Sequence, residues 1–174
     1  MPVTGNIVIS SSAAETLTTP ENRSGEIIDA VRETYSFLNG TNAGQADLVW
    51  SGRVTVPSLA TWVLDLAPLS VNAVAQTDAF GNAITFVEIT AIIIRNRETV
   101  TPRTLRVGPT AAQPFLWLFA DASDRLDVVT GSCYAQWDDV GVTVGAGASD
   151  QLDLQNLSAA AGVTVDIFLL GRSV

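Results

Sequence analysis

Thr85-Phe-Val-Glu-Ile-Thr-Ala-Ile-Ile-Ile-Arg95 is the stretch that decides the fold class. Its apolar residues first alternate with polar ones and then become continuous, as in a central strand covered on both faces. Similar short runs recur along the chain, at residues 48–56, 62–66, 104–107, 115–119, 126–130, 140–144, 152–155 and 163–170. Turn residues separate these runs at intervals of about 8–12 residues. The sequence therefore predicts an all-β protein, an antiparallel β-sandwich of jelly-roll-like type with an extended N-terminal segment.

The first 44 residues have a different, simpler pattern. Residues 5–10 have the composition of a strand, and a stretch rich in Ser, Thr and Ala follows to Pro20. Residues 26–38 carry both a helical apolar stripe and a strand-like alternation, and the β-rich context favours a strand. We expect a sandwich domain over 45–174. Residues 1–44 are either an arm that contacts neighbouring subunits or, more simply, the first strands of the same sandwich.

The composition narrows the range of functions. The chain has 174 residues and a mass of 18.3 kDa. Of the residues, 47% are hydrophobic and 16% are charged, which excludes a disordered chain because disorder requires low hydrophobicity and high charge. No apolar run approaches the roughly 20 residues of a membrane helix, and no secretory signal is visible, so we expect a soluble protein with no membrane partner. The net charge of −9 and the absence of a basic stripe exclude a nucleic-acid partner.

The chain also lacks the usual catalytic groups. It contains no histidine, one cysteine and no lysine, so it has no general base near neutral pH and no thiolate zinc site. The glycine-rich stretch 145–149 lacks the lysine of a phosphate-binding loop. We expect no enzyme activity, no catalytic residues and no cofactor.

Two acidic stretches are candidates for a metal site or a catalytic acid pair. Asp121, Asp124 and Asp127 could offer oxygen ligands to Ca²⁺, but Arg125 lies among them and the spacing differs from that of an EF-hand, so a solvated turn is favoured and no metal is expected. Asp138-Asp139 follows Trp137 like a glycosidase dyad beside a sugar-binding aromatic. Adjacent residues of a strand point to opposite faces, however, and a strand end or a turn at the surface is favoured.

The aromatic residues and the cysteine are better explained by packing. Four tryptophans occur within or beside predicted strands, at Trp50, Trp62, Trp117 and Trp137. They could form a carbohydrate platform, but burial in the core or in a subunit interface is favoured. Cys133 has no histidine to activate it, and we expect it to be a small buried apolar residue.

One group of basic residues is a candidate site for partner binding. Arginines cluster in sequence around Thr101-Pro102, at Arg95, Arg97, Arg103 and Arg106. Arginine forms bidentate pairs with carboxylates, so the cluster could bind an acidic partner surface. Equally, it could neutralise Glu88 and Glu98 of the same chain.

Several blocks of the sequence resemble a known family. They begin with Gln45-Ala-Asp-Leu-Val-Trp-Ser-Gly-Arg-Val-Thr-Val56 and Leu64-Asp-Leu66, continue with the most specific block, Thr77-Asp-Ala-Phe-Gly81, and close with Leu152-Asp-Leu-Gln-Asn156 and Gly162-Val-Thr-Val-Asp-Ile-Phe-Leu-Leu-Gly171. In this order, over residues 45–171, they resemble small structural proteins of tailed-bacteriophage virions. The resemblance implies a place in a virion, and it does not imply a mechanism.

Within a virion, the role we expect is that of a capsid decoration, or cement, protein. Such a protein is made in the host cytoplasm, binds the outer capsid surface at local three-fold axes, and stabilises the shell by bridging subunits of the major capsid protein. A homotrimer suits such a position. The alternative is a component of the tail, baseplate or fibre whose β-sandwich binds glycans or a receptor.

Overall fold

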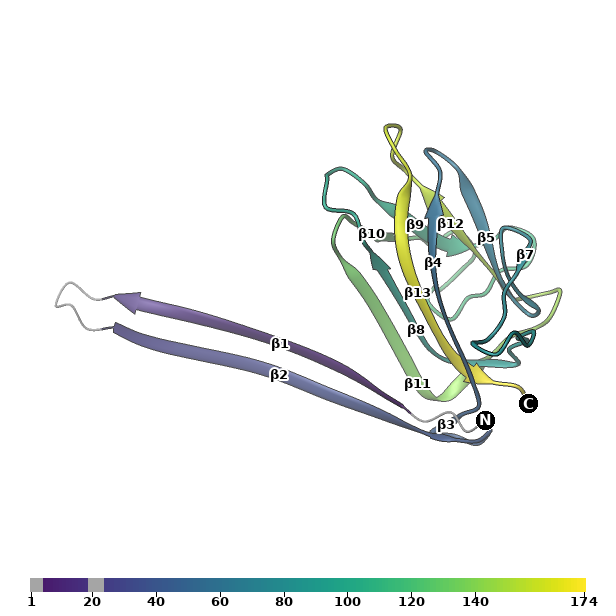
Figure 1. Ribbon diagram of the computed structural model, residues 1–174, viewed down its shortest axis with the longest axis horizontal. Coiled ribbons are helices and arrows are strands. Elements are labelled where there is room, and N and C mark those ends of the chain that lie inside the picture. Colours follow the sequence, from purple (N-terminus) through teal and green to yellow (C-terminus); the bar gives the residue numbers. More distant parts are fainter. Residues whose placement is uncertain (1–4, 19–23) are drawn as a thin grey trace.

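The secondary-structure elements in the described part of the chain are all β-strands, which confirms the predicted class. The computed structural model describes residues 5–18 and 24–174, with side chains from Ser36 onward. Within these ranges it contains no helix that is long and apolar enough to cross a membrane. Two antiparallel sheets form a sandwich, and a separate hairpin projects from it (Figure 1).

The two sheets of the sandwich contain four and six strands. The four-stranded sheet has the order β11 (Cys133–Thr143), β8 (Glu88–Asn96), β13 (Val163–Arg172) and β4 (Leu48–Val56). The six-stranded sheet has the order β10 (Leu126–Val128), β9 (Leu105–Pro109), β12 (Gln151–Asn156), β5 (Thr61–Leu66), β6 (Leu69–Val71) and β7 (Val74–Ala75). Every pairing in both sheets is antiparallel.

The strand order is that of a jelly roll. Without the short edge strands β6 and β7, eight strands remain, which alternate between the sheets along the chain except where one sheet takes β9 and β10 in succession. Counted from β4, one sheet contains the first, eighth, third and sixth strands, and the other contains the second, seventh, fourth and fifth. This is the double Greek-key arrangement of jelly rolls, in agreement with the predicted fold.

The hydrophobic core lies between the two sheets. Alternate residues of β13 enter it, and Val163, Val165, Ile167 and Leu169 are each at most 1% exposed. Phe86 and Phe115 are among its largest fully buried side chains. Burial of one large apolar side chain stabilises a fold by about 1.5–3 kcal/mol, so this alternation is what fixes the strand register.

One predicted strand is absent from the described structure. Residues 115–119 form a turn, in which the nitrogen of Phe119 donates to the carbonyl of Leu116 at 2.8 Å. Phe115 is nevertheless 1% exposed, and Trp117 packs against it edge-on with ring centroids 6.4 Å apart. The prediction was wrong because these apolar residues close the core from a loop, where their spacing resembles that of a strand.

Another strand begins earlier in the chain than predicted. Residues 140–144 were expected to form a strand, but β11 begins at Cys133 and is interrupted by a bulge between Trp137 and Val142. Gly141 lies in this bulge with φ of 78°, and the guanidinium of Arg172 donates to the carbonyl of Val140. A bulge breaks the period of two, which hides the first half of the strand from a sequence reading.

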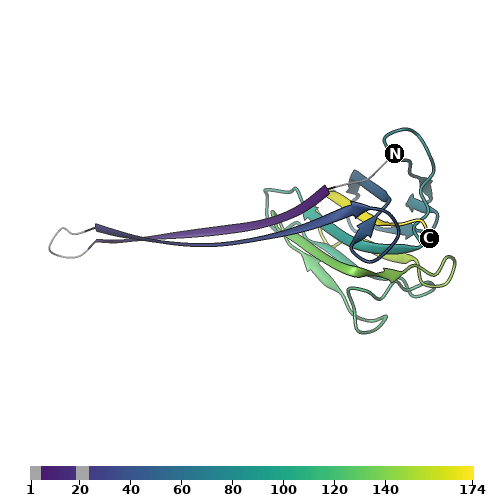
Figure 2. The same cartoon turned by 90° about the horizontal axis from the view of Figure 1, so that it is seen from below.

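The N-terminal segment forms a hairpin outside the sandwich. Strands β1 (Gly5–Thr18) and β2 (Ser24–Asn39) pair antiparallel over the 14 residues of β1. The strand predicted over 26–38 is therefore confirmed. β2 also pairs in parallel with the short strand β3 (Gln45–Ala46), and these three form a sheet of their own. Both views show β1 and β2 extending away from the body (Figures 1 and 2).

Candidate partner-binding face

The side of the four-stranded sheet that points away from the core is called here the outer face. The strand register places three rows of four residues across it, in the order β11, β8, β13 and β4. These rows are Cys133–Arg95–Asp166–Arg53, then Ala135–Ile93–Phe168–Ser51, then Trp137–Ala91–Leu170–Val49. The first row is charged and the other two are largely apolar, so the face is divided into two halves.

The charged half carries an excess of arginine. Nε of Arg53 lies 2.6 Å from Oδ1 of Asp166, and Nε of Arg97 lies 3.6 Å from Oδ2 of the same carboxylate. The hydrogen bond from Arg53, and then the charges of Arg53, Arg97 and Arg95, hold the pKa of Asp166 below its ordinary value. Three arginines thus surround one carboxylate, which leaves two positive charges on a chain whose net charge is −9.

The apolar half of the outer face holds the root of the hairpin. Phe37, near the end of β2, is 2% exposed and forms a small cluster with Ala46, Ala91 and Leu170. The half-buried side chains that pack against this cluster are Ile93, Trp137 and Phe168. The hairpin is therefore anchored by apolar contacts to the outer face, on the side of the sheet opposite the main core.

Hydrogen bonds reinforce the same attachment. The nitrogen of Gly44, in the loop between β2 and β3, donates to the carbonyl of Asp139 in the bulge of β11 at 2.9 Å. The nitrogen of Asp47 donates to the carbonyl of Gly171 at 3.1 Å, and its carboxylate accepts from the nitrogen of Ser173 at 2.9 Å. The root of the hairpin thus has apolar contacts with β11, β8 and β13, and hydrogen bonds to β11 and β13.

The structure separates the four arginines predicted to bind a partner. Arg95 and Arg97 lie together on and beside the outer face, each exposed to solvent. Arg106 lies on β9 in the other sheet, where its Nε contacts Oδ1 of Asp127 at 2.8 Å. Arg103 forms an ion pair with Glu98 in a loop, as the alternative interpretation expected for that residue, whereas Glu88 pairs with Arg172.

Arg53 lies in the charged row with Arg95, beside Arg97, and the sequence did not indicate it. It reaches the row because β13 pairs with β4 on one side and with β8 on the other, so that Asp166 stands opposite both Arg53 and Arg95. Asp166 and Arg53 are separated by 113 residues in the sequence. Their opposite charges and their strand-like surroundings were visible in the sequence, but their pairing depends on the strand order.

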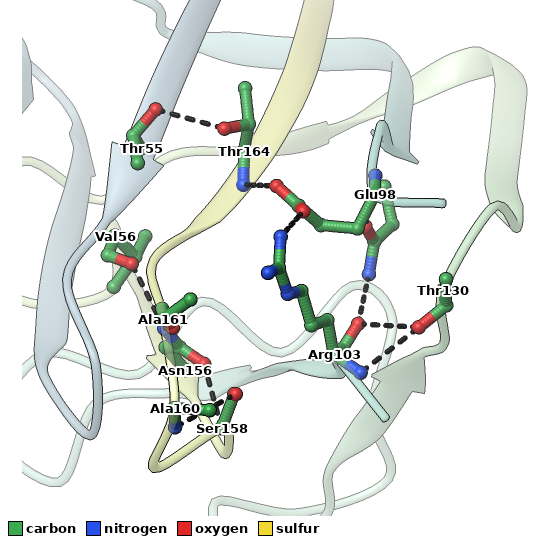
Figure 3. A network of polar contacts seen from close by, with 11 residues as sticks. Thr55, Val56, Glu98, Arg103, Thr130, Asn156, Ser158, Ala160, Ala161 and Thr164 are labelled. Carbon is green, nitrogen blue, oxygen red and sulfur yellow. Dashed lines mark hydrogen bonds and ion pairs between the residues drawn. The ribbon is translucent and has the colours of Figure 1, made fainter. Parts of the chain in front are cut away.

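A polar network closes the end of the sandwich at which the loops after β4, β8, β10 and β12 meet (Figure 3). The carboxylate of Glu98 accepts from the backbone nitrogen of Thr164 at 2.8 Å and from the guanidinium of Arg103. The hydrogen bond from Thr164, followed by that from Arg103, lowers the pKa of Glu98. Asn156, which is 1% exposed, donates to the carbonyls of Val56 and Ala161. These contacts tie the loops at this end of the sandwich together.

The two acidic stretches have structural contacts of their own. Asp121 accepts from the hydroxyl and from the backbone nitrogen of Ser123, both at 2.6 Å, and these two hydrogen bonds lower the pKa of Asp121. Asp124 accepts from the nitrogen of Ala120, while Asp127 is turned toward Arg106. Among the residues with described side chains, no three acidic or cysteine residues are grouped so that they could hold a metal ion.

Asp138 and Asp139 lie at the bulge of β11 at the surface. The carboxylate of Asp138 accepts from the nitrogen of Val140 at 2.8 Å, which is a local turn contact. Asp139 contributes its backbone carbonyl to the root of the hairpin, as described above. The pair therefore shapes a bulge within β11, whereas a strand end or a surface turn was predicted.

The tryptophans are not exposed, but the cysteine is. Trp50 is 5% exposed in the main core, and Trp62 and Trp117 pack at its margin. Trp137 packs instead in the cluster beneath the hairpin root. The prediction that Cys133 is buried was wrong, because the thiol is exposed at the edge of the charged row. Its side chain extends from the edge strand toward the outer face, where its cross-strand neighbour is Arg95.

No protein-family model matches this chain, and no curated protein matches its sequence. The candidate site therefore depends on geometry alone. Its distinguishing features are a projecting hairpin, an apolar anchorage for the root of that hairpin, and an adjoining row of arginines. Surfaces that combine a desolvated apolar part with a charged part are typical of protein–protein recognition.

Proposed function

We propose that this protein is a structural, non-enzymatic component of a tailed-phage virion, and that it decorates the outer capsid surface and stabilises the shell. The observation that carries the proposal is the 14-residue pairing of β1 with β2, which places a long hairpin outside a closed jelly-roll body. A body with a projecting arm is suited to bridging neighbouring subunits. The resemblance over residues 45–171 supports the setting in a virion.

The chemistry of the described surface is consistent with adhesion. The ion pairs tie arginines to carboxylates within the chain, and the acidic stretches cap turns. An acidic protein, with a net charge of −9, has no need to approach the packaged genome if it lies outside the shell. In this function the partner is the major capsid protein, and the protein associates with itself as a homotrimer.

The experiment compares shells with and without the protein. Purified protein is added to DNA-filled shells that lack it, bound protein is counted after sedimentation, and the temperature of DNA release is recorded. We expect saturable binding and a higher release temperature. Serum albumin at the same concentration is the control for nonspecific adsorption.

Two results together would overturn the decoration function. A protein that does not sediment with shells, and whose absence leaves the release temperature unchanged, is not a decoration protein. If it then appears in purified tails and binds glycans on an array, the tail alternative replaces the proposal.

A further inference from the structure

Among the residues that the structure describes, no third strand lies beside the hairpin along most of its length. β1 pairs only with β2, and β2 meets β3 only at Leu38 and Asn39. An isolated two-stranded hairpin is marginally stable in water, and its open edges and faces are suited to contact with another chain. Fourteen residues of strand extend about 45 Å, which is long enough to reach across a neighbouring domain of this size.

The sequence of the hairpin has a charge pattern that follows the period of a strand. Counting back in twos from Phe37, which is buried on the outer face, gives Tyr35, Glu33, Val31, Asp29 and Ile27. Their register partners in β1 are Ile7, Ile9, Ser11, Ala13 and Glu15. This set of positions contains three acidic residues and no arginine, together with several apolar residues.

The other set of positions lacks this character. It contains Arg32 opposite Ser10 and Glu26 opposite Thr16, which balance in charge, and otherwise small or polar residues together with Val8 and Ile28. The set that shares its parity with Phe37 is therefore both more acidic and more apolar. A partner for these positions needs apolar surface and positive charge.

The outer face of this protein has both properties. Its charged half carries Arg53, Arg95 and Arg97 around the carboxylate of Asp166. The adjoining row presents the half-buried side chains of Ile93 and Phe168, beside the cluster that Phe37 of the same copy occupies. The hairpin projects away from its own body, so its length beyond the root does not cover the face from which it starts (Figure 2). The same face on another copy remains available to it.

We propose that the hairpin of one copy binds the outer face of a second copy. The acidic positions of the hairpin then lie against Arg53, Arg95 and Arg97 in the charged half of that face. Each copy then gives one hairpin and receives another, which is a head-to-tail contact of the kind that forms a ring when the rotation between copies closes. This inference rests on the self-association in the proposed function and does not depend on attachment to a capsid.

The first test uses Cys133, the only cysteine in the chain, as a reporter on the outer face. A tagged variant with Val31→Cys and Cys133→Ser is mixed with the untagged natural chain and treated with a short bismaleimide linker. We expect a cross-linked pair of one tagged and one untagged chain. The matched control is Ala30→Cys in the same background, which lies at the other parity and should cross-link several-fold more slowly.

The second test exchanges charges. The variant R95E/R97E retains the pair between Arg53 and Asp166, and we expect it to weaken self-association at least tenfold by light scattering. D29R/E33R should weaken self-association by a similar factor. A chain that carries all four substitutions should self-associate as the natural chain does. Arg125→Glu, an exposed arginine that lies against Gly108 on the other sheet, should leave the assembly unchanged.

The outcomes separate this inference from the proposed function. If deletion of residues 1–35 leaves the number of subunits in the oligomer unchanged, another surface holds the oligomer and the inference is wrong. If the natural chain is monomeric at all concentrations and no mixed cross-link forms, self-association is wrong as well. Shell binding is measured independently, so the decoration function stands or fails on its own result.

Discussion

The carboxylate of Glu98 lies 2.8 Å from the backbone nitrogen of Thr164, the second residue of β13, and so joins the loop after β8 to a strand 66 residues later in the chain. Arg103 completes the contact from the same loop as Glu98. Because the carboxylate side chain is only 11% exposed, these hydrogen bonds are made largely out of water. The closed end of the sandwich thus depends on one ionised group.

Replacing Glu98 with glutamine should therefore destabilise the protein. The amide retains the shape but loses the charge-assisted bonds, and we expect the free energy of unfolding to fall by about 1–2 kcal/mol. Urea denaturation at pH 7 measures this change. Asp127→Asn is the control, since it removes a more exposed ion pair and should cost less than about 0.5 kcal/mol.

The same residue should give the stability a pH dependence. The pKa of Glu98 is lowered in the folded state from its ordinary value of 4.5, so its stabilising contribution is present above that value. The contribution is lost as the pH falls through the lowered pKa. We expect the difference in unfolding free energy between the natural chain and E98Q to shrink steadily below about pH 4.5. A difference that stays constant down to pH 2 would contradict the assigned role.

Asn156 should tolerate no charge. Its Nδ2 group donates to the carbonyls of Val56, Pro57 and Ala161 at 2.9–3.0 Å, and its Oδ1 accepts from the nitrogen of Ser158. Asn156→Asp has the same shape but removes both donor hydrogens and buries a carboxylate beside three carbonyls. We expect a loss of about 3 kcal/mol or more at pH 7.

Two comparisons make this test specific. The deficit of Asn156→Asp should become smaller at acid pH, because burial raises the pKa of the new carboxylate and protonation then removes its charge. Asn42→Asp, at an exposed position, should change the stability by less than about 0.5 kcal/mol. Equal deficits in the two variants would show that the contacts of Asn156 contribute nothing.

Phe37 should control the attachment of the hairpin. Phe37→Ala removes the 2% exposed ring from the cluster on the outer face, while Leu38→Ala alters a neighbour that is 65% exposed. We expect Phe37→Ala to accelerate tryptic cleavage after Arg32 several-fold, with the sandwich still folded by circular dichroism. Leu38→Ala should be cleaved at the natural rate, and equal rates for both variants would refute the anchorage.

Gly171 should accept no side chain. A Cβ atom there would lie 2.1 Å from the carbonyl oxygen of Glu88 and 2.7 Å from the ring of Phe86. Because the backbone of a paired strand cannot move aside, Gly171→Ala should cost about 2–3 kcal/mol. At Gly108 the nearest atom belongs to the flexible side chain of Arg125, at 2.2 Å. Gly108→Ala should therefore destabilise the fold much less than Gly171→Ala. Thermal unfolding of the two variants measures this difference.

The fold was predictable because its core strands keep a strict alternation. β12 and β13 bury every second residue at their sequence-visible apolar positions, and both strands were placed within two residues of their observed ends. The turn at residues 115–119 and the bulge of β11 were not predictable in this way. In both places the apolar spacing is set by contacts with distant strands and not by the local conformation.

The candidate site was only partly predictable. Arg95 and Arg97 lie two residues apart, so a strand places both on one side. Arg106 follows the crossing from β8 to β9 and so belongs to the other sheet, which no local pattern reveals. Arg53 and Asp166 enter the site through strand pairing alone. Sequence reasoning therefore found the arginines but could not find the surface that they share.

The position of β13 has a consequence for how the chain folds. It lies between β8 and β4 in its sheet, although it follows every other strand in the sequence, and β12 likewise lies between β9 and β5. On a ribosome, β4 and β8 must therefore wait with unpaired edges until the last strands emerge. Such long-range pairing slows folding to milliseconds or seconds, and the unpaired edges expose the nascent chain to aggregation during that time.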